Sequence, residues 1–228
     1  MKTWRISTTT SIRWETIGCI DHPFVLLPLA AVTKKTSYIV FDLEATCWRL
    51  HKPPRQEIIE IGAAKINDNG EHVGSFNSFV KPMQNPKLSS FCTQLTSITQ
   101  KDIDPAPDFQ EVMWDFEEWL NPAENEIVLL SWGDYDLKQL SMDAELHQIE
   151  LSWANRHYCL KTAHARLLNL REPVGVTTAL QFGGMAFEGS KHRAIADAEN
   201  TARIFSMHFD DWDFIHHPKI GLRGINRR

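Results

Sequence analysis

The segment that most constrains the fold of this chain is residues 38–44, Tyr-Ile-Val-Phe-Asp-Leu-Glu, where an apolar run ends in two carboxylates. The run is short, β-branched and aromatic, which predicts a buried β-strand. Side chains alternate between the two faces of a strand, so Asp42 and Glu44 point to the same side. Two neighbouring carboxylates repel each other, and burying them without a partner is costly. The pair therefore predicts a site for a divalent cation at the end of a rigid element.

After Ser37 the chain alternates between strand and helix patterns. A three-stranded antiparallel meander is expected first, followed by alternating helices and strands, and this order predicts an α/β fold with a mixed sheet flanked by helices. The length of 228 residues suits one sizeable domain. We expect an N-terminal extension (1–36), one domain (37–210) and a C-terminal tail (211–228). The expected strands are 38–44, 57–64, 73–80, 127–130 and 157–160, and the last clear helix is 194–208.

Composition narrows the class of protein. A net charge of −5 argues mildly against a protein that coats long nucleic acids, but little against an enzyme with a local acidic site. The four cysteines show no C-x-x-C spacing, which argues against a zinc site or a disulfide framework and favours reduced thiols in the cytoplasm. The longest apolar stretch, Phe24–Val32, is too short to span a bilayer.

Two later clusters could supply further metal ligands. Asp134 and Asp136 follow the buried strand 127–130, at the carboxyl end where sites of α/β sheets form. Asp197 lies in the last helix, where neighbouring alanines would let the helix approach another element closely.

His192 precedes Asp197 by five residues, which corresponds to about 140° around a regular helix. The two side chains could not share a site if both were helical, so His192 is expected on the loop before the helix. Gly189 and Ser190 in that loop would allow movement. A histidine on a loop and an aspartate on a helix suit a general base and a metal ligand, respectively.

Asp42, Glu44, Asp136, His192 and Asp197 together form an arrangement that resembles the DEDDh family of 3′–5′ exonucleases. The resemblance covers most of the chain and implies a ribonuclease-H-like mixed five-stranded sheet. Within that family, the chain is most similar to the histone-mRNA and small-RNA 3′ trimming exonucleases and their bacterial sporulation-inhibitor-like relatives. The segments that carry this resemblance are Glu44–Cys47, Phe79–Pro82, Leu95–Thr99, Ser131–Asp136 and His192–Ala194, with Ser97 where glycine is usual in the family.

The resemblance implies a role for each residue of the site. Asp42 would bridge two Mg²⁺ ions, which Mn²⁺ could replace, and Glu44, Asp136 and Asp197 would complete the ligand set. His192 would take the proton of the attacking water. Glu44, Ala45 and His192 would also contact the terminal nucleotide. Trp48, Phe91 and Leu95 are candidates to stack on a base, with core packing as the alternative.

Other chemistry-bearing residues receive simpler interpretations. Asp134 is expected to be a turn or cap residue, since Asp136 matches the family position. Glu57 and Glu60 are expected in structural or solvent-facing roles. The nine histidines other than His192 are expected on the surface or as hydrogen-bonded core residues.

The sequence thus predicts a two-metal-ion 3′–5′ exonuclease that releases nucleoside 5′-monophosphates from single-stranded nucleic acid, with RNA favoured. One alternative is a DNA exonuclease of repair or proofreading. Another is a nucleic-acid-binding protein on the same fold that has lost catalysis, although binding alone would not require all five catalytic residue types. No membrane association is expected, and a partner protein could select the target.

Overall fold

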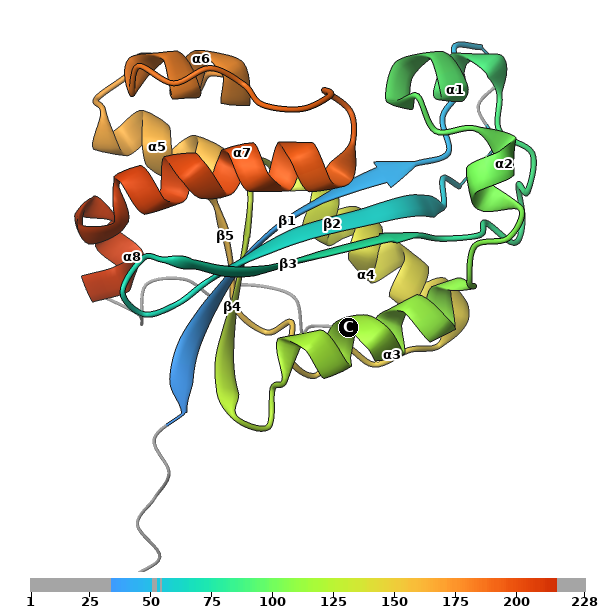
Figure 1. Cartoon of the computed structure of the whole chain (residues 1–228), viewed down its shortest axis with the longest axis horizontal. Coiled ribbons are helices and arrows are strands. Elements are labelled where there is room, and N and C mark those ends of the chain that lie inside the picture. Colours follow the sequence, from blue (N-terminus) through green and yellow to red (C-terminus); the bar gives the residue numbers. More distant parts are fainter. Residues whose placement is uncertain (1–33, 51–52, 54, 217–228) are drawn as a thin grey trace, which may run out of the picture. The chain divides into compact units, whose positions relative to one another are not determined.

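A mixed five-stranded sheet forms the centre of the part of the chain that the computed structural model describes, residues 34–50, 53 and 55–216. The spatial order is β3-β2-β1-β4-β5, with the first three strands antiparallel and β4 and β5 parallel to β1 (Figure 1). This confirms the predicted meander and the predicted mixed sheet. The strands are β1 (Lys35–Ala45), β2 (Ile58–Ile66), β3 (His72–Phe79), β4 (Asn125–Ser131) and β5 (His157–Cys159).

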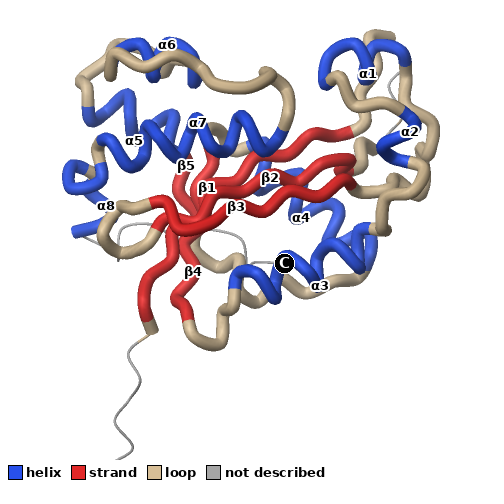
Figure 2. Tube along the Cα trace, viewed as in Figure 1, coloured by secondary structure: helices blue, strands red, loops and turns tan. Residues whose placement is uncertain are grey.

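Helices cover both faces of this sheet (Figure 2). Helices α3 and α4 cover one face of the sheet and α5, α6 and α7 the other, which gives two hydrophobic cores separated by the sheet. The short helices α1 and α2 lie beyond the carboxyl end of β1 (Figure 1). The helices are α1 (Ser90–Thr96), α2 (Gln100–Ile103), α3 (Phe109–Leu120), α4 (Tyr135–His147), α5 (Leu160–Leu167), α6 (Val176–Phe182), α7 (Ala194–Met207) and α8 (Asp213–His216).

The alternation of side chains along β1 decides which helix faces the acidic pair. Ile39 and Phe41 enter the core beneath α3 and α4, whereas Tyr38 and Val40 enter the core beneath α7. The even-numbered positions continue as Asp42 and Glu44, so both carboxylates lie on the α7 face of the sheet. Along the α7 face of β1, hydrophobic core side chains are thus followed by the two carboxylates of the candidate site.

Helix α7 begins almost in contact with β2. A β-carbon at Gly62 would lie 2.1 Å from the Ile195 nitrogen and 2.2 Å from the Ala194 carbonyl carbon, so only glycine fits there. Ala194 and Ala198 are fully buried on the sheet side of the helix. The close approach expected from the alanines is therefore present, and it depends equally on a glycine in the facing strand.

Regular structure extends beyond the expected domain at both ends. Strand β1 starts at Lys35, two residues early, and pairs with β4 from its first residue. Residues 211–216 do not behave as a tail, because Trp212 is 1% exposed and its indole nitrogen donates to the Phe205 carbonyl. The rest of the expected extension and tail, residues 1–33 and 217–228, lies outside the described residues. Within the described part, every helix is too short or too polar to cross a bilayer.

Candidate active site

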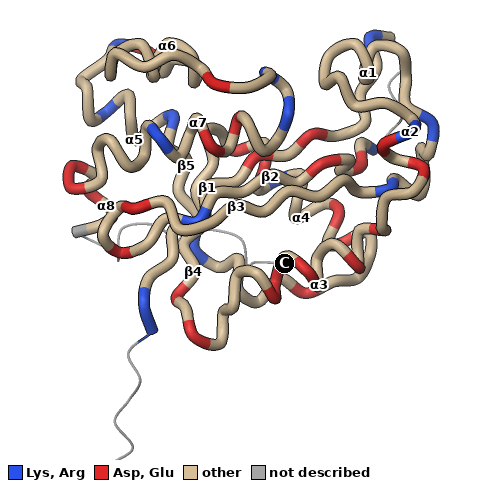
Figure 3. The backbone as a smooth tube through the Cα atoms, in the orientation of Figure 1, with Lys and Arg blue, Asp and Glu red and all other residues tan. Residues whose placement is uncertain are grey.

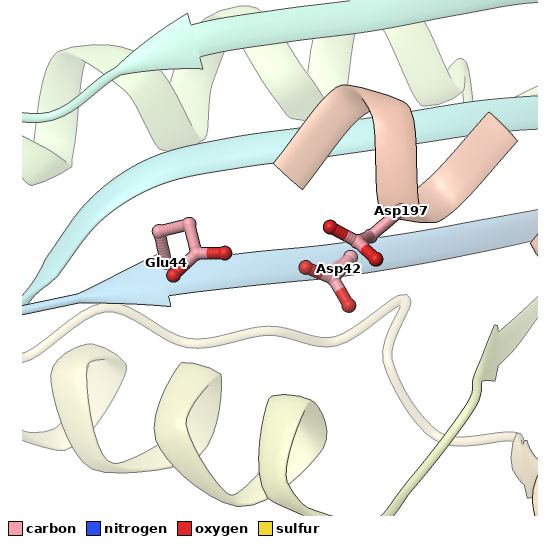
Figure 4. Close-up of side chains that lie close together, drawn as sticks. All are labelled: Asp42, Glu44 and Asp197. Atoms are coloured by element: carbon pink, nitrogen blue, oxygen red, sulfur yellow. The ribbon is translucent and has the colours of Figure 1, made fainter. Parts of the chain in front are cut away.

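Three half-buried carboxylates meet where β1 passes beneath the first turn of α7. Asp42 and Glu44 rise from the strand, and Asp197 descends from the helix (Figure 4). One oxygen of each lies within 4.8 Å of an oxygen of the other two. The close packing of α7 against Gly62 brings Asp197 to this distance from Asp42 and Glu44, which lie more than 150 residues earlier in the sequence.

Asp136 lies near this cluster, close enough for its charge to act on Asp42. It lies in the first turn of α4, is 5% exposed, and accepts a hydrogen bond from the Leu43 backbone nitrogen at 3.3 Å. Asp134 occupies the N-cap position of α4, makes no capping hydrogen bond with its side chain, and is exposed. Of these two aspartates, the structure therefore places Asp136 beside Asp42 and leaves Asp134 at the turn.

Burial and mutual repulsion raise the pKa of each of these carboxylates above its usual range. Burial is the largest cause that raises the pKa of Glu44 to about 8, with the Asp197 carboxylate next. Burial likewise raises the pKa of Asp136 to about 7, although the bond from Leu43 opposes it. The pKa of Asp42 is raised well above its usual range by burial and then by Asp136 and Asp197. The site therefore stores unfavourable electrostatic energy that a cation would relieve.

The donor set fits a hard divalent cation. It consists only of carboxylate oxygens, held on two rigid elements, and the nearby guanidinium of Arg193 is bonded to a different carboxylate, Glu60. All-oxygen sites with several carboxylates are typical of Mg²⁺, Mn²⁺ and Ca²⁺. Asp42, Glu44 and Asp197 therefore meet the requirements of the divalent-metal centre on which DEDDh exonucleases depend.

His192 lies outside the helix, as its spacing from Asp197 predicts. It is exposed, in the loop before α7, and its backbone adopts a left-handed conformation with φ of 60°. Its backbone nitrogen donates to Asp197 Oδ2 at 2.8 Å. This bond ties the loop to the metal cluster and leaves the imidazole directed to solvent, where a substrate could meet it.

A cavity of about 640 Å³ lies between α1, α4 and the loop that follows β1. Trp48 and Phe91 line it, but Leu95, which is 39% exposed on α1, does not. Tyr135 also lines it and lies close enough to Asp136 and Glu44 for their charges to act on it; burial and these charges raise its pKa to about 12. Tyr135 belongs to the Ser131–Asp136 segment of the sequence but received no role there.

Both glutamates of the second strand region are structural. Glu57 is 2% exposed and accepts hydrogen bonds from the backbone nitrogens of residues 83–85. Glu60 is fully buried and holds Arg193. Solvent-facing roles are thus excluded for both.

The expectation of satisfied core histidines is wrong for His164. This residue is fully buried among aromatic rings, and neither ring nitrogen has a hydrogen-bond partner. His157 fits the expectation, because its Nε2 lies 2.8 Å from Ser131 Oγ. Ser97 ends α1 with φ of 61°, the left-handed conformation in which a glycine commonly stands.

Comparison with known proteins connects this geometry to a family. The exonuclease family model RNase_T matches residues 39–205. The ERI1 exoribonuclease 2 of Danio rerio is 34% identical over 186 residues, which cover 73% of this chain and 34% of that protein. The probable 3′-5′ exonuclease KapD of Bacillus subtilis is 28% identical, over 80% of this chain and 89% of that protein.

Among solved structures, the nuclease domain of 3′hExo, a DEDDh family member bound to rAMP, superposes with a TM-score of 0.72. It is 28% identical, and the match covers 79% of this chain and 95% of that domain. The chain spans only about a third of the length of the ERI1 exoribonuclease 2 proteins that it matches. The ribonuclease-H-like fold expected from the sequence is confirmed by this structural match.

Proposed function

The chain belongs to the RNase_T exonuclease family, and from this membership we propose that it is a metal-dependent 3′–5′ exonuclease that removes nucleotides from single-stranded RNA as 5′-monophosphates. The observation that carries the proposal is the cluster of Asp42, Glu44 and Asp197 beside the buried Asp136. A protein that only bound nucleic acid would gain nothing from four carboxylates facing a polyanion, because they repel phosphate unless a cation is bound.

We assign the metal ligands to this cluster, with two Mg²⁺ ions as the preferred occupants and Mn²⁺ as a substitute. Asp42 is proposed as the central ligand, since its carboxylate lies within 4.8 Å of those of Glu44 and Asp197 and close enough to Asp136 for that charge to act on it. When bound, the ions would supply the positive charge that activates a water molecule and stabilises the leaving 3′ oxygen.

His192 is the proposed general base. Its imidazole is exposed beside the cluster, and the bond from its backbone nitrogen to Asp197 fixes the start of the side chain. Imidazole is the side chain best suited to take a proton from water near neutral pH, as a general base must. Asp197 thus serves both as a ligand and as an anchor for the loop that carries the base.

The cavity lined by Trp48, Phe91 and Tyr135 is the proposed site of the terminal nucleotide. Aromatic side chains offer stacking surfaces to any base, at roughly 1–3 kcal/mol per stacked base. Arg49 and Lys138 line the same cavity and would compensate the charge of a phosphate. Glu44 and Ala45 lie at the strand end that leads into it, where the family resemblance puts contacts to the nucleotide.

RNA is the proposed substrate because several of the similar proteins are named exoribonucleases and the similar nuclease domain is bound to rAMP. We further propose a cytoplasmic location, in line with the few cysteines and their lack of C-x-x-C spacing. We also propose that a partner protein directs the enzyme to its RNA.

The test is digestion of oligonucleotides labelled at the 5′ end, with matched RNA and DNA sequences, in Mg²⁺ or Mn²⁺. Stepwise shortening from the 3′ end is expected, with RNA degraded faster, and neither EDTA-treated enzyme nor a 3′-phosphorylated substrate should react. Asp42→Ala should abolish activity, and Asp136→Asn and His192→Ala should reduce it by at least 100-fold.

Asp134→Asn is the matched control, because Asp134 lies two residues from Asp136 yet outside the cluster. It should retain activity within about twofold. Loss in Asp134→Asn with full activity in Asp136→Asn would overturn the ligand assignment. Faster degradation of DNA would replace the RNA preference, and no degradation with either metal would favour the binding protein.

A further inference from the structure

A buried ion pair joins β2 to the start of α7 outside the carboxylate cluster. Glu60 is fully buried, and both its oxygens accept hydrogen bonds from Arg193, from Nη2 at 2.8 Å and from Nε at 3.1 and 3.2 Å. The Ala194 backbone nitrogen donates to the same carboxylate at 3.0 Å. Glu60 therefore holds the side chain that precedes α7 and also accepts from the first helical residue, whose backbone N–H is one of the groups that a helix start leaves without partners.

This pair lies between the two functional residues of the segment. His192 immediately precedes Arg193, and Asp197 lies one turn after Ala194, with its backbone nitrogen bonded to the Arg193 carbonyl. His192 has a φ of 60°, a left-handed conformation that is unfavourable for a non-glycine residue and persists only where its surroundings impose it. The bonds to Glu60 on one side and to Asp197 on the other impose it here.

We propose that Glu60 and Arg193 form a positioning clamp that fixes the backbone of residues 192–194 and thereby aims His192 and Asp197 at the reacting phosphate. The proposal rests on the nuclease activity proposed above. In this proposal neither Glu60 nor Arg193 contacts substrate or metal. The loop that carries His192 is fixed where it joins α7, whereas Gly189 gives the upstream part of the loop conformational freedom.

The charge balance explains why the clamp needs both partners. Glu60 lies directly opposite Glu44 in the β1–β2 register, so an unneutralised Glu60 would repel a carboxylate of the metal cluster. The guanidinium cancels that charge and is itself held against the Phe79 ring, 5.2 Å from the ring centroid. Figure 3 shows basic residues just before α7 beside the acidic residues of the strands and of the helix start. A neutral residue at either position would unbalance the site as well as loosen the loop.

The experiment compares Glu60→Gln and Arg193→Lys with the control Glu57→Gln. Glu57 is an equally buried carboxylate next to β2 that bonds backbone nitrogens of residues 83–85 and not α7. Hydrogen exchange of a peptide spanning residues 188–200 reports the clamp without reference to activity. Steady-state kinetics on an RNA oligonucleotide with Mn²⁺ separates kcat from KM, and thermal unfolding monitors the fold.

We expect both clamp variants to exchange residues 188–200 at least tenfold faster, with other peptides unchanged, and to lose 10- to 100-fold in kcat with KM within twofold. Glu57→Gln should leave the exchange of residues 188–200 and kcat unchanged. Unchanged exchange of residues 188–200 in Arg193→Lys and Glu60→Gln would overturn the clamp, as would a rise in KM at constant kcat, which would make Arg193 a substrate contact. Inactive wild-type enzyme would refute the proposed function, while the exchange result would still decide the clamp. If Glu60→Gln fails to fold, Arg193→Lys carries the test.

Discussion

Replacement of Gly62 by alanine should separate folding from catalysis in this protein. The added β-carbon would lie 2.1 Å from the Ile195 nitrogen and 2.5 Å from the Ala194 carbonyl oxygen, whereas ordinary contacts begin at 3.4 Å. Both neighbours are backbone atoms, so no flexible side chain can turn aside. The first turn of α7 must therefore move away from β2 by about 1.3 Å, the difference between the two distances.

The displacement acts directly on the site because Asp197 and His192 belong to the segment that moves. A shift of about 1 Å in positioning groups can cost about 100-fold in rate, equivalent to about 2.7 kcal/mol of transition-state stabilisation. Overpacking also destabilises the fold by roughly 1–3 kcal/mol. We therefore expect Gly62→Ala to fold, with a lowered melting temperature and kcat reduced by about 100-fold.

The assay is single-turnover digestion of an RNA oligonucleotide at a temperature well below the melting transition, so that only folded enzyme is compared. Gly74→Ala is the control, because a β-carbon at Gly74 in the neighbouring strand β3 meets only the Trp119 indole nitrogen, at 3.9 Å. It should leave both the melting temperature and the rate close to wild type. Wild-type rate and stability in Gly62→Ala would show that the close packing of α7 on β2 does not set the geometry of the site.

Three further outcomes are expected. Ser97→Gly should stabilise the protein by about 0.5 kcal/mol in denaturant unfolding, because Ser97 has a φ of 61°, whereas Asn121→Gly should gain less since asparagine tolerates the same conformation. Burial lowers the pKa of His157 to about 4, so between about pH 6.5 and pH 4 the unfolded chain binds a proton that the folded chain does not. The unfolding free energy should therefore fall as the pH falls through that window. In His157→Gln the unfolding free energy should depend less on pH there. Metal-free Asp42→Asn should melt about 2–4 °C higher than metal-free wild type, because relief of the repulsion at Asp42 is expected to stabilise the fold by about 1 kcal/mol. Mg²⁺ at 100 times its Kd should stabilise wild type by about 2.7 kcal/mol and should not stabilise Asp42→Asn. Equal stabilisation of both proteins by Mg²⁺ would exclude Asp42 as a ligand.

The sequence by itself determined much of this architecture. The apolar run ending at Glu44 and the buried strand before Asp136 are local patterns, and local patterns of period 2 and 3.6 are enough to predict strands, helices and their order. The same alternation predicts that Asp42 and Glu44 share a face. Helical spacing alone puts His192 on a loop, where the structure has it.

The tertiary structure decided which distant groups meet, because that depends on register and packing that no local pattern contains. The role of Glu60 depends on the β1–β2 register, which places it opposite Glu44, and on the packing of α7 against Gly62, which brings Arg193 into contact with Glu60. The burial of Trp212 was likewise invisible, since one aromatic residue in an irregular segment carries no period. The acidic pair on β1 thus predicted that a cation is needed, and only the packing of α7 on β2 supplied the third carboxylate to hold it.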